Sequence, residues 1–273
     1  MDTPAALSSV PVNDCAVDDE VHTSLEVIGK LYNYNHWIFN RIRPFVRGCV
    51  CEIGSGIGNI TQFLLNHERV VGVEPYGRSF QSAADRFADH RNVSFVPCTL
   101  ERCPNEELPA GSFDTVICLN VLEHIKDDLD ALRRMRALCK PGGRVVILVP
   151  ALMALYGSLD QSFGHYRRYG RRGLCRLFEE AGMRVSWSSY MNAIGVFGWL
   201  WEGRVLRRRN ISTQSARTFN RIVPFVDAFE RVFRPPFGQS VIVVGQRIGS
   251  SDAIASGIAA PRPEAASHDH AVA

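Results

Sequence analysis

Short apolar stretches recur through the middle of the chain, and longer amphipathic stretches separate them. The apolar stretches are CVCEIG, RVVGVE, VSFVPC, DTVICLN and RVVILVP. The stretches between them include NITQFLLNH, RSFQSAADRFADH and DLDALRRMRALC, which carry apolar residues at helical spacing. Strands that alternate with helices predict an α/β fold in which helices cover both faces of a parallel sheet. Ligands of such sheets bind at the carboxyl ends of the strands.

The pattern continues on both sides of this region. Residues 23–47 predict an aromatic-rich amphipathic helix that breaks near Pro44, because proline does not continue a helix. Beyond Pro150, RRGLCRLFEEAG predicts a helix that ends at Gly182, and MRVSWSSY and SVIVVGQR predict two more strands. Residues 192–239, between these two strands, are rich in aromatic residues and arginine. We expect them to form helices that cover one end of the sheet.

Composition narrows the classes of function. A formal net charge of +3 does not indicate a nucleic-acid-binding protein, and 46% apolar residues suffice for a packed core. The eight cysteines form no CxxC pair and no zinc-type spacing with histidine, so neither a structural metal nor a disulfide framework is predicted. The N-terminus has no signal-peptide pattern, and no apolar run approaches the roughly 20 residues that span a bilayer. These features predict a cytoplasmic protein.

The stretch VCEIGSGIGNIT places three alternate glycines, Gly54, Gly56 and Gly58, directly after the first predicted strand. Glycine permits left-handed backbone and a close approach to a ligand. A dinucleotide-binding turn would carry its third glycine at position 59, where this chain has asparagine. Acidic residues end the first two strands, Glu52 and Glu74, and a carboxylate at the second position can accept both ribose hydroxyls. Acid, glycine turn and acid together predict a site for a cationic nucleoside.

Four segments in order, VCEIGSGIGNIT, VVGVEP, FDTVICLNVLEHI and LCKPGGRVVILVP, resemble the class I S-adenosylmethionine-dependent methyltransferases. The resemblance covers roughly residues 47–150 and implies a Rossmann-like, seven-stranded sheet, mostly parallel with an antiparallel last strand. It also implies S-adenosyl-L-methionine as the cofactor. The acid and glycines of the first segment would hold its methionine part, and Glu74 would bind its ribose. The residues that the resemblance implies for cofactor binding are Glu52, Gly54, Ser55, Gly56, Gly58, Glu74, Pro75, Tyr76, Thr99, Leu100 and Asn120.

One departure from the family concerns the adenine. After the third strand the family often has an acid for the adenine amino group, whereas this chain continues with threonine, leucine and glutamate. The predicted organisation is a single methyltransferase domain over residues 23–248, between disordered ends at 1–22 and 249–273. Its parts are N-terminal helices at 23–47, a cofactor-binding core at 48–150, a substrate loop and insertion at 151–239, and the last strand at 240–248.

The segment after the fifth strand contains GHYRRY, which together with LVPAxxxLYG resembles a bacterial small-molecule subgroup of these methyltransferases. The residues predicted to bind the acceptor are Tyr156, Asp160, Arg167, Arg168 and Tyr169. Arginine presents a planar fork of donors that matches phosphate or carboxylate oxygens. Arg167, Arg168, Arg171 and Arg172 therefore predict an anionic acceptor, phosphorylated or an isoprenoid diphosphate. The alternative is that these arginines cap the following helix or pair with its glutamates.

Catalysis is specified more loosely. Methyl transfer from a sulfonium depends mainly on the alignment of donor and acceptor, and an oxygen, nitrogen or acidic carbon acceptor also needs a base. The candidates near the predicted pocket are His165, His124, Tyr166 and Glu123. His165 is favoured as the base because it lies in the predicted substrate loop. For His124, a structural role under the cofactor is an equal alternative.

Three functions remain open at this point. The first is a methyltransferase for a small-molecule acceptor in biosynthesis, with no nucleic-acid partner because no DPPY-like motif is present. The second acts on lipid-linked or natural-product hydroxyl groups at a membrane surface, because AIGVFGWLWEGRVLRRRN joins an apolar, Trp-rich run to basic residues. A lid over an apolar substrate fits that run equally, and packing against the N-terminal aromatic residues is favoured over both. The third is a non-catalytic regulatory protein that binds the cofactor. These patterns do not predict an oligomeric state.

Overall fold

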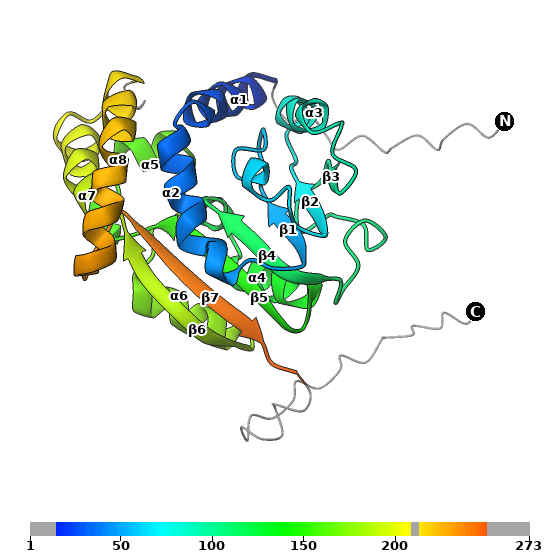
Figure 1. Ribbon diagram of the computed structural model, residues 1–273. Helices are drawn as coiled ribbons and strands as arrows, with labels where there is room; N and C mark the ends of the chain where they lie inside the picture. Colours follow the sequence, from blue (N-terminus) through cyan, green and yellow to red (C-terminus); the bar gives the residue numbers. More distant parts are fainter. Residues whose placement is uncertain (1–14, 209–212, 250–273) are drawn as a thin grey trace, which may run out of the picture.

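The protein is built on one sheet of seven strands, in a computed structural model that describes residues 15–208 and 213–249. The strands lie in the order β3-β2-β1-β4-β5-β7-β6 (Figure 1). β7 is antiparallel to both of its neighbours, and the other pairs are parallel. The bounds are β1 Cys49–Ile53, β2 Arg69–Val73, β3 Val93–Val96, β4 Phe113–Leu119, β5 Cys139–Pro150, β6 Met183–Met191 and β7 Ser240–Arg247. The predicted Rossmann-like sheet with an antiparallel last strand is confirmed.

Helices cover both faces of the sheet, which explains why the central strands are nearly continuous runs of valine and isoleucine. The covering helices are α2 Tyr32–Ile42, α4 Asp128–Leu138, α6 Arg171–Glu180 and α8 Thr213–Phe233. On one face, α4 and α6 bury Met135 and Phe178 in the core. On the other face, α2 and α8 lie side by side (Figure 1) and bury Trp37 and Val223. This sandwich fixes the strand ends that carry the site.

The N-terminal region is more ordered than predicted. α1 covers Cys15–Gly29, so residues 15–22, predicted to be disordered, are helical. Val21, Leu25 and Ile28 recur at helical spacing and supply α1 with an apolar stripe, which explains why the helix extends this far. The predicted disordered ends before residue 15 and after residue 249 lie outside the described residues.

The predicted break of the N-terminal helix is also in a different place. The chain leaves the helical conformation at Leu31, between α1 and α2, where φ is −92° and ψ is 63°. Pro44 lies instead in η1 (Arg43–Phe45), a short 3₁₀ turn that ends α2. Proline is tolerated there because the first residues of a helical turn need no internal N–H bond.

The glycine turn does not lead into the predicted long helix. NITQFLLNH forms only the 3₁₀ turn η2 (Thr61–Phe63), and the next full helix is α3 (Gly77–Arg86) after β2. Tertiary contacts override helix propensity here. The ring of Phe63 stacks on Phe39 of α2 at 5.3 Å between centroids, which draws this segment under α2.

The segment after β6 forms helices, as predicted. α7 (Ala193–Trp199) runs into a π-helix, η5 (Leu200–Val205), and α8 follows. Two short elements, η4 (Met153–Leu155) and α5 (Ser158–Ser162), lie in the loop after β5. Within the described parts of the chain, no helix is both long and apolar enough to cross a membrane.

Candidate active site

The carboxyl ends of β1 and β2 bring the two predicted acids together. Glu74 accepts hydrogen bonds from the backbone N–H of Gly56 at 2.7 Å and of Tyr76 at 3.1 Å. Glu52 accepts a hydrogen bond from the Thr61 hydroxyl at 2.6 Å. Both acids are buried. Burial, and secondly the charge of Glu74, raise the pKa of Glu52 to about 8, against the pull of the Thr61 hydrogen bond.

The glycine turn has the conformation that the sequence predicts. Gly54, Gly56 and Gly58 have φ values of 72°, 55° and 80°, in the left-handed region that side chains rarely adopt. Around this turn the Ser55 hydroxyl is buried, and no group in the described part of the chain forms a hydrogen bond with it. Glu52 has no ion-pair partner among the described residues. A buried acid without a cation and an unpaired hydroxyl fit a cationic, polar ligand such as the methionine part of S-adenosylmethionine.

α1 covers this turn, which the sequence analysis did not foresee. Asn59 Nδ2 donates to the carbonyl of Leu25 at 3.0 Å, and a Cβ placed on Gly56 would lie 3.0 Å from the Leu25 side chain. His22 lies within 3.3 Å of the Ser79 hydroxyl, which ties α1 to α3 as well. The apolar spacing of α1 was visible in the sequence, but the surface on which α1 would pack was not. We infer that α1 screens the cofactor edge from solvent.

The residues predicted to lie beside the adenine differ in how far their side chains are exposed. Pro75 and Tyr76 lead into α3 and are half-buried, as a ligand-lining position requires. After β3, Thr99 is half-buried, whereas the side chain of Leu100 packs in the hydrophobic core. Leu100 can therefore offer a ligand its backbone but not its side chain.

A disulfide joins Cys98 to Cys103 in the loop after β3. The sequence predicts no disulfide framework, and the spacing of this short link matches no motif that would have revealed it. On the methionine side, Asn120 follows β4 with a φ of 55° and is exposed, and its N–H donates to Leu148 at 2.8 Å. Asparagine tolerates this left-handed backbone better than most residues.

A hydrogen-bonded cluster lies at the ends of β4 and β5. His165 Nδ1 is 2.9 Å from Asp160 Oδ1, and Arg168 Nε donates to the same oxygen at 2.7 Å. Trp199 of α7 donates to Asp160 Oδ2 at 3.3 Å, and Tyr156 donates to the carbonyl of His165 at 2.7 Å. Burial tends to raise the pKa of Asp160, but the hydrogen bonds from His165 and Arg168 outweigh it and hold that pKa below its usual range. Asp160 therefore fixes the orientation of the His165 ring.

Two further predicted residues face His165 from η3 (Leu122–His124), the 3₁₀ turn after β4. Glu123 is fully buried, and its Oε1 lies 4.0 Å from His165 Nε2. The ring of His124 meets that of His165 edge-on at 4.8 Å between centroids. Burial raises the pKa of Glu123 to about 8, whereas burial and then the His165 ring lower the pKa of His124. Glu123, His124 and His165, all predicted from the sequence, thus lie together in one cluster.

Tyr166 does not join them. Its side chain is 56% exposed, and only its backbone N–H reaches inward, donating to the carbonyl of Glu123 at 2.9 Å. The predicted role of the Tyr166 hydroxyl as a base has no support in this geometry, because the ring stands at the surface above the guanidinium of Arg167.

The predicted acceptor-binding arginines are engaged within the protein. Arg167 pairs with Asp128 at 2.7 Å and donates to the carbonyl of Lys126 at 2.7 Å. Arg168 is buried and bonds to Asp160 and to the carbonyl of Ala151. Neither guanidinium is free for an anionic acceptor, and their acidic partners are Asp128 and Asp160 rather than the glutamates of the following helix. Both acids lie outside the pattern GHYRRY, Asp160 eight residues before Arg168 and Asp128 in α4, so the pattern alone could not reveal these pairs.

Two other predicted acceptor residues are also structural. The side chain of Tyr169 is buried and donates to Asp128 at 2.9 Å. Asp160 is fully buried, and its oxygens are taken by His165, Arg168, Trp199 and the backbone N–H of Gly157. Neither side chain is open to a substrate. Tyr156 is half-buried beside His165 and stays a predicted acceptor residue.

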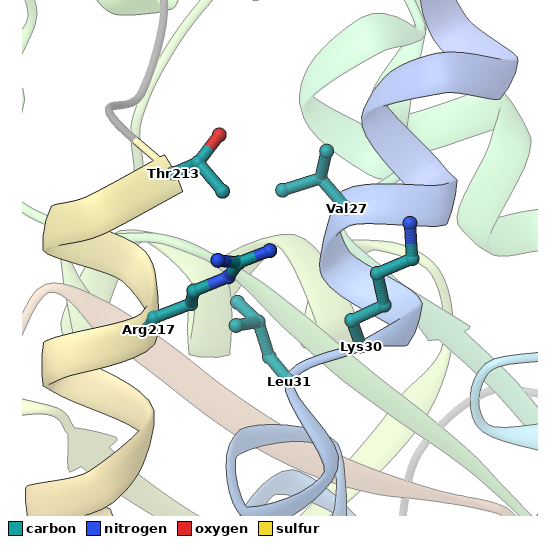
Figure 2. A pocket seen from close by; sticks show the side chains of 5 residues that line it. All are labelled: Val27, Lys30, Leu31, Thr213 and Arg217. Carbon is teal, nitrogen blue, oxygen red and sulfur yellow. The ribbon is translucent and has the colours of Figure 1, made fainter.

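A small cavity of about 50 Å³ lies between the end of α1 and the start of α8. It is lined by Val27, Lys30, Leu31, Thr213 and Arg217. Figure 2 shows the guanidinium of Arg217 reaching from α8 toward the end of α1, with Lys30 across the cavity. Neither basic side chain has an acidic partner among the described residues. The cavity lies at the C-terminal end of α1, the helix whose Leu25 contacts the glycine turn.

Comparisons with known proteins agree with this architecture. Residues 51–145 match the family described as "Methyltransferase domain". A curated relative, the tRNA U34 carboxymethyltransferase of Ruthia magnifica subsp. Calyptogena magnifica, is 28% identical over 117 residues, which are 41% of this chain and 36% of that protein. The match thus spans about a third of the relative's length.

Solved structures share the fold. One is the complex of the Haloferax volcanii Trm112 methyltransferase activator with a putative methyltransferase (TM-score 0.60, 16% identity, covering 85% of this chain and 97% of that one). Another is phosphoethanolamine N-methyltransferase 2 of Haemonchus contortus in complex with S-adenosyl-L-methionine (TM-score 0.56, 18% identity, covering 85% and 57%). The glycine turn, its two acids and the last antiparallel strand are arranged as the family resemblance implied. The chain therefore carries a methyltransferase domain of the S-adenosylmethionine-dependent class, with its matched core at residues 51–145.

Proposed function

We propose that this protein transfers a methyl group from S-adenosylmethionine to a small-molecule acceptor. The observation that carries the proposal is the meeting of two half-sites at one edge of the sheet. The ends of β1 and β2 carry the buried acids Glu52 and Glu74 around the glycine turn. The ends of β4 and β5 carry His165, held by Asp160 and facing Glu123.

One set of residues would bind the methyl donor, and a second set would position the acceptor. When bound, the cofactor supplies a methyl group on a positively charged sulfur. Glu52, Ser55 and the glycines would hold its methionine part, and Glu74 its ribose. The fixed ring of His165 and the carboxyl of Glu123 would position the acceptor, and alignment of this kind is the main contribution that such an enzyme makes. The buried setting of both half-sites excludes water from the reacting atoms.

A binding and turnover experiment tests the proposal directly. Calorimetry should show that the purified protein binds S-adenosylhomocysteine and not NAD, because Asn59 stands where a dinucleotide site needs glycine. Incubation of candidate acceptors with labelled cofactor, followed by mass spectrometry, should show a labelled product. Cofactor binding without any product across phosphorylated, isoprenoid and hydroxylated acceptors would favour the non-catalytic regulatory function. Absence of binding by the folded protein would refute the proposal.

Replacing Glu74 by alanine should weaken S-adenosylhomocysteine binding by at least about tenfold. The carboxylate would accept two ribose hydroxyls, and hydrogen bonds to a charged group contribute roughly 1.5–3 kcal/mol each. It also fixes the N–H groups of Gly56 and Tyr76, so the turn itself loses support. Calorimetry on Glu74→Ala and on the exposed control Asp85→Ala measures the effect. Equal affinity of both variants would mean that the ribose is held elsewhere.

The acceptor is proposed to be anionic, phosphorylated or an isoprenoid diphosphate in biosynthesis. The support comes from Lys30 and Arg217, which face one cavity and form no ion pair with an acid of the residues that the structure describes. Two like charges around one hollow repel each other, and an anion between them relieves that repulsion. Arginine and lysine together also suit phosphate oxygens.

Inorganic pyrophosphate is the probe for this site. Lys30→Ala and Arg217→Ala should each weaken its binding, or its inhibition of turnover, roughly fivefold, which corresponds to about 1 kcal/mol for a partly exposed charge pair. The affinity for S-adenosylhomocysteine should stay unchanged. Arg221→Ala, one helical turn further along α8 and exposed, is the matched control. Unchanged pyrophosphate binding in both variants would refute an anion site in this cavity.

A second candidate is the same reaction on a lipid-linked acceptor at a membrane surface. The observation in its favour is that many apolar side chains on α7, η5 and α8 are exposed, although the run was expected to pack inside the protein. The members are Ile194, Phe197, Leu200, Trp201, Val205, Ile222, Phe225, Phe229, Val232 and Phe233. Arg204, Arg208 and Arg231 in the same part of the chain are also exposed. Apolar and basic side chains that face one surface would suit an anionic bilayer.

Vesicle binding separates the two candidates. Co-sedimentation with vesicles of phosphatidylcholine and phosphatidylserine, but not of phosphatidylcholine alone, would support the membrane candidate. The double variant Phe225→Ser/Phe233→Ser should then lose vesicle binding and keep cofactor binding. A concentration-dependent dimer that the same variant abolishes, with no vesicle binding by the intact protein, would assign the apolar surface to self-association instead.

A further inference from the structure

Glu123 stands out among the buried groups. Its side chain has no exposed surface, and neither carboxylate oxygen has a hydrogen-bond partner within residues 15–208 and 213–249. The guanidinium of Arg168, a permanent cation in the same cluster, donates its hydrogen bonds to Asp160 and to a backbone carbonyl. An acid buried in this way is costly unless a ligand or an ion satisfies it. Something other than the described protein groups is therefore expected to meet the Glu123 oxygens.

Two imidazoles face the same space. The ligand atoms of Glu123, His124 and His165 all lie within 4.8 Å of one another. His165 Nδ1 is bonded to Asp160 at 2.9 Å, which leaves Nε2 directed at Glu123 Oε1, 4.0 Å away. A carboxylate behind a histidine is the usual arrangement that orients a metal-binding imidazole and fixes its tautomer. The ring of His124 is likewise held from behind by the carbonyl of Gly164, which leaves its other nitrogen for a ligand.

We propose that Glu123, His124 and His165 bind one divalent transition-metal ion, such as Mn²⁺, Fe²⁺, Co²⁺ or Zn²⁺. Two imidazoles and one carboxylate form a donor set for these ions, whereas Mg²⁺ and Ca²⁺ prefer oxygen ligands throughout. Bonds of roughly 2.1 Å place the ligands of one ion about 3.4 Å apart, so the three atoms need to draw together slightly. His124, whose ring reaches the surface, has the room to do so.

The charges of the cluster favour a cation. Glu123 and Asp160 are acids, the buried Arg168 pairs with Asp160, and the two histidines ligate as neutral rings. The cluster therefore holds one excess negative charge when its acids are ionised. Attraction across a buried, low-dielectric space is stronger than at the surface.

Three protein ligands leave positions open on the ion. In this placement, which rests on the proposed methyltransferase function, an oxygen of the acceptor would fill an open position. The acceptor oxygen would then lie beside the end of β4, on the side where the resemblance places the methyl donor. Metal sites with an open position bind and polarise a ligand oxygen in this way. The acceptor class is thereby narrowed to molecules that carry a hydroxyl or carboxylate able to bind a metal.

Metal binding by the whole chain tests the inference without reference to turnover. The protein is stripped with a chelator and dialysed, and Zn²⁺, Mn²⁺ and Mg²⁺ are titrated separately by calorimetry. One Zn²⁺ or Mn²⁺ per chain is expected, with Mg²⁺ binding much more weakly. Co²⁺ should give the visible absorption of a low-symmetry site. His165→Ala and Glu123→Gln should each weaken binding by at least tenfold, and Asp160→Asn, which disturbs the orientation of His165, by roughly 10–100-fold.

Matched controls exclude other histidines and misfolding. The double variant His268→Ala/His270→Ala, in the histidine-containing tail, should bind the metal as the intact chain does. His124→Ala alters a side chain that reaches the surface, so the fold should survive even if a change at a buried position disrupts it. Circular dichroism and S-adenosylhomocysteine binding verify each variant.

The outcomes are distinct. Metal binding that His124→Ala weakens while S-adenosylhomocysteine binding persists supports the site. Metal binding that is lost only with the tail histidines, or an intact chain that binds the cofactor but no transition metal, overturns it. Cofactor binding and metal binding are measured separately. A protein that binds the cofactor but no metal refutes the metal site and leaves the proposed methyltransferase function standing. A protein that binds the metal but not the cofactor refutes the proposed methyltransferase function alone.

Discussion

Asp160→Ala is expected to lower the free energy of unfolding by about 3–5 kcal/mol, because it leaves the buried guanidinium of Arg168 without its acid. The Asp160–Arg168 pair is fully buried on both sides, with Nε and Oδ1 2.7 Å apart. Removing one residue of the pair leaves the other as an unpaired buried charge, whereas removing both leaves no buried charge unpaired. Arg168→Met should therefore also destabilise the protein strongly, and the double variant should cost clearly less than the sum of the two.

Urea unfolding of the four proteins in the presence of a chelator measures this coupling free energy without any contribution from a metal. The pair Asp130–Arg134 is the matched control, because its side chains are 43% and 46% exposed at a similar distance of 2.6 Å. Asp130→Ala should cost less than about 1 kcal/mol. Additive losses at Asp160 and Arg168 would show that the two residues act separately.

The sequence did not predict that buried pair, although it predicted the strands and the cofactor edge. The strands were predictable because their apolar runs are continuous and bounded by glycine, proline or charge. The cofactor edge was predictable because Glu52, the glycines and Glu74 lie at fixed positions after two such strands. In both cases the information is local, so spacing along the chain corresponds to position in space.

The acceptor side was only partly predictable for the opposite reason. Arg167 and Arg168 follow His165 closely in sequence, and nothing local distinguishes a guanidinium that binds substrate from one that binds Asp128 or Asp160. The choice is made by tertiary contacts. Glu123, His124 and His165 were each identified, yet their convergence on one space depends on how η3 and the loop after β5 meet.

The placement of Lys30 and Arg217 around one cavity was even less predictable from the sequence. They are far apart in the chain, and neither lies in a motif, but α1 and α8 place them around one cavity. α1 itself was underestimated because acidic and small residues before position 23 suggested disorder. The apolar stripe of α1 stabilises the helix only where it packs on another surface, and in the folded protein Leu25 packs against the glycine turn.

Binding of S-adenosylhomocysteine is expected to release about one proton below pH 8 and to tighten roughly tenfold per pH unit between pH 6 and 8. In the free protein, burial and then the neighbouring Glu74 raise the pKa of Glu52 to about 8, while Thr61 opposes the shift. Glu52 is thus mainly protonated at neutral pH. The ammonium group of the ligand favours the carboxylate, so binding must remove that proton.

Calorimetry in buffers with different ionisation enthalpies counts the released proton. Glu52→Gln should bind more weakly at pH 8, and its affinity should not change over this pH range. Glu68→Gln, at an exposed position, should behave as the unchanged protein does. An affinity that is independent of pH in the unchanged protein would mean that Glu52 is ionised before binding, or that it does not meet the ammonium group.

The same shift predicts an effect on stability without ligand. Between pH 4.5, the ordinary pKa, and about 8, the folded protein retains a proton on Glu52 that the unfolded chain has lost. The native state then binds more protons, so its stability falls as the pH rises, by roughly 1.4 kcal/mol per unit from this group. Glu52→Gln removes this loss, because the amide stays neutral in both states. Urea unfolding should therefore show Glu52→Gln becoming progressively more stable than the unchanged protein from pH 5 to 8, and a constant difference over that range would contradict a buried, protonated Glu52.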